Sequence, residues 1–140
     1  MKWKGEMIKQ SKIDKLFNLA CQSTPVSNAR VVAAIFDGKE LIAIGNNQSK
    51  THSFQSRFQK NEKALWIHAE INAIYKATKK IGLDRLKRCT MFVIRAKKNM
   101  ISKDWEYGLA RPCSGCQAAI SVFNIKNVYY STDNGEILKL

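Results

Sequence analysis

The sequence predicts an α/β domain in which helices cover a mixed β-sheet of about five strands. The chain has 140 residues, of which 45% are hydrophobic, so it is long enough for one packed core and too short for two. Apolar runs rich in β-branched residues alternate with segments of helical periodicity, and no internal repeat interrupts them. We therefore expect a single domain over residues 1–140.

The first half of the chain predicts a helix followed by a β-hairpin. Apolar residues recur at helical spacing over 13–20. The β-branched run ARVVAAIF, residues 29–36, is typical of a buried strand, and the tight-turn signal at 37–39 leads into a second apolar strand at 40–45. The polar segment 46–63 is longer than an ordinary connection, which favours a binding loop.

The second half predicts two further helices set between strands. Apolar residues form one stripe along a helix over 67–80, and Gly82 ends that helix. The elements expected after it are a strand over 89–96, a helix over 112–123, a strand over 127–131 and a closing strand after the turn at 134–135. Only nine residues follow Ser131, too few for a crossover helix, so the closing strand must fold back as an antiparallel hairpin.

Charge and composition limit the partners and the compartment. The formal net charge is +13, from 24 Lys and Arg against 11 Asp and Glu, which favours a phosphate-bearing partner. Charge alone does not separate a polynucleotide surface from a nucleotide pocket, and scattered lysines also form ordinary solvated surface. No apolar run approaches the roughly 18 residues of a membrane span, so we expect a cytoplasmic protein without a membrane partner. The four cysteines are then free thiols or metal ligands.

Two short motifs carry the chemistry. His68 and Glu70 stand two positions apart at the expected start of a helix, where both side chains can enter one cavity. Cys113 and Cys116 share one face of the helix that Pro112 starts. A CxxC pair alone suits a redox dithiol, half of a structural zinc site or two ligands of a catalytic metal. One imidazole and two thiolates suit tetrahedral zinc with a position open for water, beside which Glu70 would move protons.

Joined, the two motifs HAE and PCSGC resemble the H-x-E and P-C-x-x-C signature of the zinc-dependent cytidine deaminase superfamily. The resemblance implies a three-layer α-β-α fold of the cytidine deaminase type. It also implies that His68, Cys113 and Cys116 bind Zn²⁺, that Glu70 is the catalytic proton shuttle, and that Ala69 offers a backbone contact near the reacting carbon. A structural zinc with Cys89 or His52 as fourth protein ligand is the competing interpretation, and it leaves Glu70 without a role.

The candidates for substrate binding lie on the segments expected to flank the zinc: Asn46, Asn47, Ala69, His52, Trp105 and Arg111. The stretch 45–47 resembles the family's G-x-N segment, whose asparagine contacts the ring or sugar, and this role falls to Asn47, with Asn46 as its rival. Nucleoside deaminases of the family usually carry a glutamate two residues later, but Ser49 stands there. Residues 96–112 form a long insertion that is either a surface hairpin with aromatics on the core or a clamp for base and phosphate.

The closing hairpin resembles the branch of free-nucleoside cytidine deaminases, blasticidin deaminases and several phage and toxin deaminases. It differs from tRNA and polynucleotide deaminases, and also from the deoxycytidylate deaminases, although the stretch WIHAEINAI is similar to their zinc helix. The resemblance implies a homo-oligomer that hydrolytically deaminates a small-molecule cytosine-type nucleoside or nucleotide and releases ammonia. The alternative is a polynucleotide-directed deaminase, in which an extruded base of single-stranded DNA or RNA enters the same pocket. A zinc-stabilised nucleic-acid-binding module without activity is a third interpretation.

Overall fold

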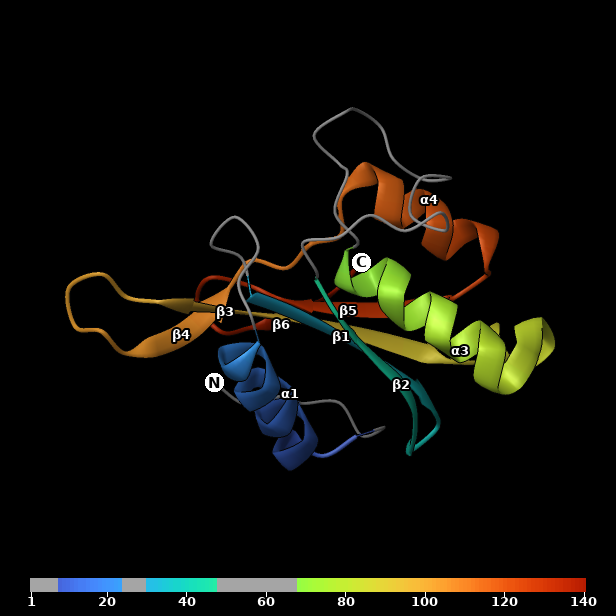
Figure 1. The fold of residues 1–140 in the computed structure, drawn as a ribbon, viewed down its shortest axis with the longest axis horizontal. Coiled ribbons are helices and arrows are strands. Elements are labelled where there is room, and N and C mark those ends of the chain that lie inside the picture. Colours follow the sequence, from blue (N-terminus) through green and yellow to red (C-terminus); the bar gives the residue numbers. More distant parts are fainter. Residues whose placement is uncertain (1–7, 24–29, 48–67) are drawn as a thin grey trace.

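A computed structural model of the chain describes residues 8–23, 30–47 and 68–140, and it confirms the α/β prediction (Figure 1). The described elements, in chain order, are α1 (Gln10–Gln22), β1 (Arg30–Asp37), β2 (Glu40–Asn46), α3 (Ala69–Leu86), β3 (Thr90–Lys98), β4 (Trp105–Gly108), α4 (Ser114–Val122), β5 (Asn127–Ser131) and β6 (Ile137–Lys139). None of the described helices is long and apolar enough to cross a membrane.

The strands form one mixed sheet between two helical layers. Its order is β2-β1-β3-β5-β6, with β4 paired to β3, and β3 and β5 run parallel while the other pairs are antiparallel. Helix α1 covers one face, and α3 and α4 cover the other (Figure 1). The predicted closing hairpin of β5 and β6 is confirmed. The three-layer architecture predicted from the resemblance is therefore present.

The sheet has a sixth strand that the sequence did not predict. The insertion after β3 turns back on itself and pairs as β4, with Lys98 opposite Trp105 and Arg95 opposite Gly108. The ring of Tyr107 stacks on Phe17 of α1 with 4.2 Å between centroids, which buries part of the strand against the core. The insertion is thus the surface hairpin with packed aromatics, and its four residues were too short and too polar to read as a strand.

Helix α3 is kinked at Gly82, where φ is 76° and ψ is 174°. This left-handed φ interrupts the helix, as the sequence predicted, because glycine adopts it without a steric penalty. The chain then resumes a helical turn up to Leu86, which is fully buried. Burial of Leu86 explains the extra turn that local periodicity did not show.

The first turns of α3 lie directly on β2, the edge strand of the sheet. A Cβ added at Gly45 would collide with the backbone nitrogen of Ala73 and the carbonyl oxygen of Ala69, so only glycine permits this approach. The Asn72 Nδ2 atom donates to the carbonyl oxygen of Asn46 at 3.2 Å. These contacts fix the start of α3 above the end of β2.

Ser131, which is fully buried, joins three segments at the end of β5. Its hydroxyl accepts a hydrogen bond from the Arg95 amide at 3.0 Å and donates one to the Gly108 carbonyl at 2.7 Å. Its own carbonyl accepts from the Ala110 amide at 2.9 Å. Ser131 therefore fixes the segment that leads from β4 to Cys113.

We predict that Ser131→Ala destabilises the protein by about 1–3 kcal/mol, because the amide of Arg95 and the carbonyl of Gly108 lose their buried partner. Urea unfolding measures this loss. Ser121→Ala, at an exposed position of α4, is the matched control and should unfold like the unmodified protein. Equal stability of the two variants contradicts the assigned role.

Asp37 ties the turn between β1 and β2 to the end of α3. Its carboxylate pairs with the Arg85 Nε at 2.6 Å and with an Arg88 terminal nitrogen at 3.0 Å. Hydrogen bonds from Arg88 and then Arg85 lower the pKa of Asp37 below its ordinary value of 3.8. A lowered pKa in the folded state means that the carboxylate stabilises the fold above the unfolded-state pKa and loses this effect on acidification.

We predict that Asp37→Asn lowers the urea midpoint at neutral pH, where the unmodified carboxylate is charged and paired. The difference in midpoint between the two proteins should shrink as the pH falls below about 4, through the folded-state pKa of Asp37. Urea titrations between pH 7 and pH 2.5 measure it. A difference that stays constant over this range would show that the charge of Asp37 is not the stabilising feature.

Candidate active site

His68 stands at the entrance of α3. It is the N-cap residue, with extended backbone angles of −81° and 154°, and its carbonyl accepts the first hydrogen bond of the helix from Asn72 at 3.0 Å. Within a helix, residues two positions apart point to nearly opposite sides. The backbone of His68 is extended rather than helical, so this rule does not separate its side chain from that of Glu70. His68 at the N-cap and Glu70 in the first turn occupy the helix start that the sequence predicted for them.

Cys113 and Cys116 stand at the equivalent place on α4. Cys113 is the N-cap residue, and Cys116 lies in the first turn with 1% of its surface exposed. The His68 Nδ1 atom is 3.6 Å from the Cys113 sulfur and 3.3 Å from the Cys116 sulfur. The three side chains lie within 4.8 Å of one another and are the one group of three potential metal ligands found among the described residues.

The spacing of these donors fits zinc. Tetrahedral zinc with bonds of about 2.3 Å to sulfur and 2.0 Å to nitrogen separates the two donors by about 3.5 Å, close to the observed nitrogen–sulfur distances. Both helices also direct their N-terminal amides, the positive ends of their dipoles, at the cluster, which favours thiolates. A bound zinc would be held by His68 Nδ1, Cys113 and Cys116.

The charges of the cluster are strongly coupled. The neighbouring Cys116 thiol and then the His68 ring lower the pKa of Cys113 to about 3. Interaction with Cys113, followed by burial, raises the pKa of Cys116, and the hydrogen bond to Cys113 raises that of His68. The cluster thus carries a stable thiolate that is complementary to a cation.

Glu70 lies in the first turn of α3 with 6% of its surface exposed. Burial is the largest influence on its carboxyl group and raises its pKa, while the His68 ring and a hydrogen bond with Cys116 act in the opposite direction. The carboxyl group therefore adjoins the ligand cluster in a site shielded from solvent.

Cys89 does not supply a fourth ligand. It is fully buried near the other end of α3, where its thiol contacts the Arg85 carbonyl at 3.4 Å. The proposed alternative through Cys89 is therefore wrong. His52, the other alternative and a candidate for substrate binding, lies outside the described residues.

Asn46 and Asn47 point to different sides of the sheet. Asn46 lines a cavity on the α1 side together with Leu19 and Val32. Gly45 faces α3, and the alternation of side chains along a strand directs Asn47 to that same side. The Asn47 Oδ1 atom accepts a hydrogen bond from the Val31 amide at 3.1 Å, which fixes the orientation of its side chain. The choice of Asn47 over Asn46 as a substrate contact stays a prediction.

Of the remaining substrate candidates, Ala69 and Arg111 are close to the metal ligands along the chain, and Trp105 is not. Ala69 is the first residue of α3, between His68 and Glu70, and Arg111 precedes Cys113 by two positions, with its guanidinium 5.9 Å from the ring centre of Tyr130. Trp105 instead lies on the α1 side of the hairpin. The Arg30 guanidinium lies 4.8 Å from the centre of its ring.

Arg95 is a residue that the sequence analysis missed. Residues of β3 alternate between the faces, and Met91 and Val93 belong to the core beneath α3 and α4, so Arg95 faces the same side as the cluster. The sequence signal that could have indicated it is the position of this arginine within the apolar run TMFVIRA. A cation amid buried strand residues requires a specific reason.

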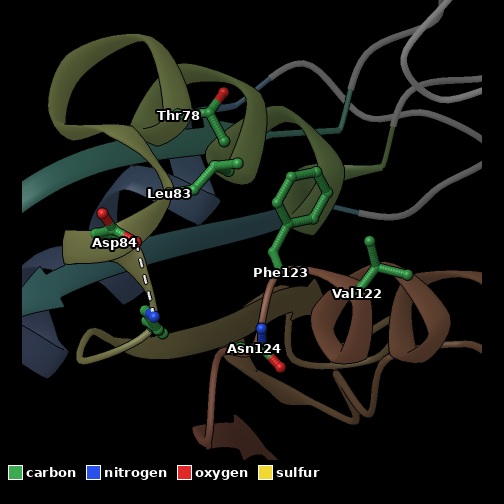
Figure 2. A pocket seen from close by; sticks show the side chains of 7 residues that line it. Thr78, Leu83, Asp84, Val122, Phe123 and Asn124 are labelled. Carbon is green, nitrogen blue, oxygen red and sulfur yellow. Dashed lines mark ion pairs between the residues drawn. The ribbon is translucent and has the colours of Figure 1, made fainter.

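A separate cavity of about 630 Å³ lies between the C-terminal parts of α3 and α4 (Figure 2). The side chains of Leu83, Val122 and Phe123 provide its apolar lining, with Asp84 and Lys87 at its rim. Its lining includes no member of the metal cluster and no predicted substrate residue. The cavity is distinct from the candidate active site.

An open zinc position beside a buried acid is the arrangement of hydrolytic zinc deaminases, and this is the class of enzyme that the fold and the cluster define. The family follows from a comparison with protein-family models. The model described as "Cytidine and deoxycytidylate deaminase zinc-binding region" matches residues 7–132, and the chain belongs to this family. The chain is therefore a zinc-binding deaminase, as the two motifs predicted.

The comparison with solved structures supports the fold. The chain is similar to the crystal structure of the dCMP deaminase from the cyanophage S-TIM5 in its apo form, with a TM-score of 0.57 and 21% sequence identity. The match covers 88% of this chain and 81% of that chain. A search of curated proteins found no match.

We predict that Cys116→Ser lowers the zinc content of the purified protein to well below one atom per chain, because a hydroxyl is a far weaker zinc ligand than a thiolate. Metal analysis by mass spectrometry measures this. Cys89→Ser removes a thiol that lies away from the cluster and should retain the zinc. Equal zinc contents in the two variants contradict the ligand assignment.

Proposed function

We propose that the protein hydrolytically deaminates the cytosine-type base of a nucleoside or nucleotide and releases ammonia. The observation that carries the proposal is the buried carboxyl group of Glu70 next to three zinc ligands, with no fourth protein ligand among the described residues. A structural zinc site would be closed by such a ligand and would leave the buried acid without a role.

The metal ligands and Glu70 have different roles in the proposed reaction. His68, Cys113 and Cys116 would hold the zinc, which would make a water molecule acidic enough to serve as the nucleophile. Glu70 takes a proton, transfers it to a ring nitrogen of the base and later delivers one to the departing amine. Burial suits Glu70 to this work because it raises the affinity of the carboxylate for the transferred proton.

Substrate orientation falls to the residues around the cluster. The backbone of Ala69 lies between the ligand and the acid, where it can contact the base, and Asn47 lies on the same side of the sheet. The hydrogen bond that Asn47 accepts from the Val31 amide supports this role, because a preoriented side chain loses less entropy when the substrate binds.

A polynucleotide substrate is the second candidate, and the net charge of +13 favours it. Binding of a single strand should weaken steeply as the salt concentration rises, whereas binding of one phosphate should respond modestly. Ammonia release from free bases, nucleosides, nucleotides and single strands separates the two candidates. Homo-oligomerisation, which the family resemblance implies, is tested by analytical ultracentrifugation.

We predict that Glu70→Gln lowers the rate of ammonia release by about 10²–10⁴-fold, because the amide cannot accept and return a proton. The variant should retain its zinc, since Glu70 is not among the ligands. Glu136→Gln, at an exposed position in the β5–β6 turn, is the control and should react at the unmodified rate. Deamination by Glu70→Gln at the native rate contradicts the assigned role.

A further inference from the structure

Arg95 has an unusual environment for an arginine. It lies in β3, the strand that pairs with β1, β4 and β5, and its Nε atom is buried. No hydrogen bond from that Nε is present within the described residues. A buried donor without a partner destabilises a protein by about 1–3 kcal/mol, so each one requires an explanation, and a bound ligand is one such explanation.

The local structure makes room for this side chain. Gly108 stands opposite Arg95 in the β3–β4 pairing, and a Cβ added there would lie 3.0 Å from the Cγ and Cδ atoms of Arg95. The absence of a side chain at Gly108 thus lets the stem of Arg95 cross β4. Ser131 holds both residues in place through its hydroxyl group.

The neighbouring acid is already neutralised. Asp133 accepts hydrogen bonds from the Lys97 ammonium at 3.0 Å and from the Leu109 amide at 3.1 Å. Hydrogen bonds from Lys97 and then Leu109 lower the pKa of Asp133, and the charge of Arg95 contributes last. Asp133 is thus already paired with Lys97, and it compensates the charge of Arg95 only through the weaker Coulombic interaction, which leaves the guanidinium able to attract an anion.

Arg95 lies on the same face of the sheet as the cluster, in line with the proposed base-binding residue. Val31 pairs with Arg95 across the sheet, and Asn47 bonds to the backbone of Val31, so the three residues form a row from the proposed base-binding position to the guanidinium. Two strand spacings, about 10 Å, separate the ends of this row. That span is comparable with the distance between the base and the phosphate of one nucleotide.

A second guanidinium lies on the same side. Arg111 stands between Gly108 and Cys113, and its NH1 atom lies 3.5 Å from the hydroxyl oxygen of Tyr130. Tyr130 pairs with Val93, which precedes Arg95 by two positions on the same face of β3. Two arginines therefore lie on the cluster side of the sheet, Arg95 in β3 and Arg111 in the segment that leads to Cys113. The planar guanidinium group of arginine matches phosphate oxygens well.

We propose that Arg95, assisted by Arg111, binds a phosphate group of the substrate and thereby selects phosphorylated cytosine nucleosides over unphosphorylated ones. This inference rests on the proposed function, because it assigns a subsite within the same active site. It accounts for the buried Nε without a partner, for the glycine opposite it and for the neutralised Asp133. The phosphate is either the monoester of a free nucleotide or a diester of a single strand.

Binding of the reaction products tests the proposal without turnover. Calorimetry compares uridine 5′-monophosphate with uridine on the zinc-loaded protein, and repeats the pair with the 2′-deoxy forms. We expect the nucleotide to bind about tenfold or more tightly than the nucleoside, and Arg95→Gln to abolish that difference. Lys98→Gln removes the same charge from the same strand but on the opposite face, and should keep the difference.

Two further binding experiments separate phosphate binding from a purely structural role of Arg95. Inorganic phosphate should compete with the nucleotide and not with the nucleoside on the unmodified protein, which tests the subsite even where Arg95→Gln fails to fold. Tight binding of a uracil oligonucleotide without tight binding of the mononucleotide identifies the phosphate as a diester and also supports the proposal. Equal affinity of nucleotide and nucleoside, with no oligonucleotide preference, overturns it. Ammonia release tests the proposed deamination separately.

Discussion

The meeting of two helix N-termini is the constraint on which the rest of the structure depends. His68 and Cys113 are N-cap residues of α3 and α4, and their ring nitrogen and sulfur lie 3.6 Å apart although 45 positions separate them in the chain. Two dipoles of the same sign directed at one point repel each other and require a negative charge between them. The thiolate of Cys113 supplies that charge, so the cluster stabilises the same packing that brings its members together.

Different contacts position the starts of α3 and α4, and the residues that make these contacts are not metal ligands. The absence of a side chain at Gly45 lets the first turns of α3 contact β2, and Asn72 bonds to the end of that strand. On the other side, Ser131 joins β3, β5 and the segment that leads to Cys113. Contacts with the sheet therefore position the helix starts that carry the donors.

The sequence predicted most of the fold and the cluster because the relevant signals are local. The turn signals at 37–39 and at 134–135 predict the two hairpins, and ligand types at short spacings predict a metal site. Strand β4 was missed because its four residues are too short and too polar for a strand pattern, and its packing through Tyr107 on Phe17, 90 positions away, has no local signal. The place of Trp105 on the α1 side of the sheet follows from the β3–β4 pairing, which the sequence analysis did not predict.

The insertion after β3 also changes the surroundings of Arg95. A chain that passed directly from β3 to the cysteines would leave the end of β3 beside solvent. Here the chain returns as β4, so that Gly108 lies opposite Arg95 and the segment to Cys113 begins above the guanidinium. This path partly buries the side chain of Arg95, and the lower effective dielectric there strengthens the attraction of a cation for an anion. Under the proposed role of Arg95, the hairpin would relate the insertion to the charge of the substrate.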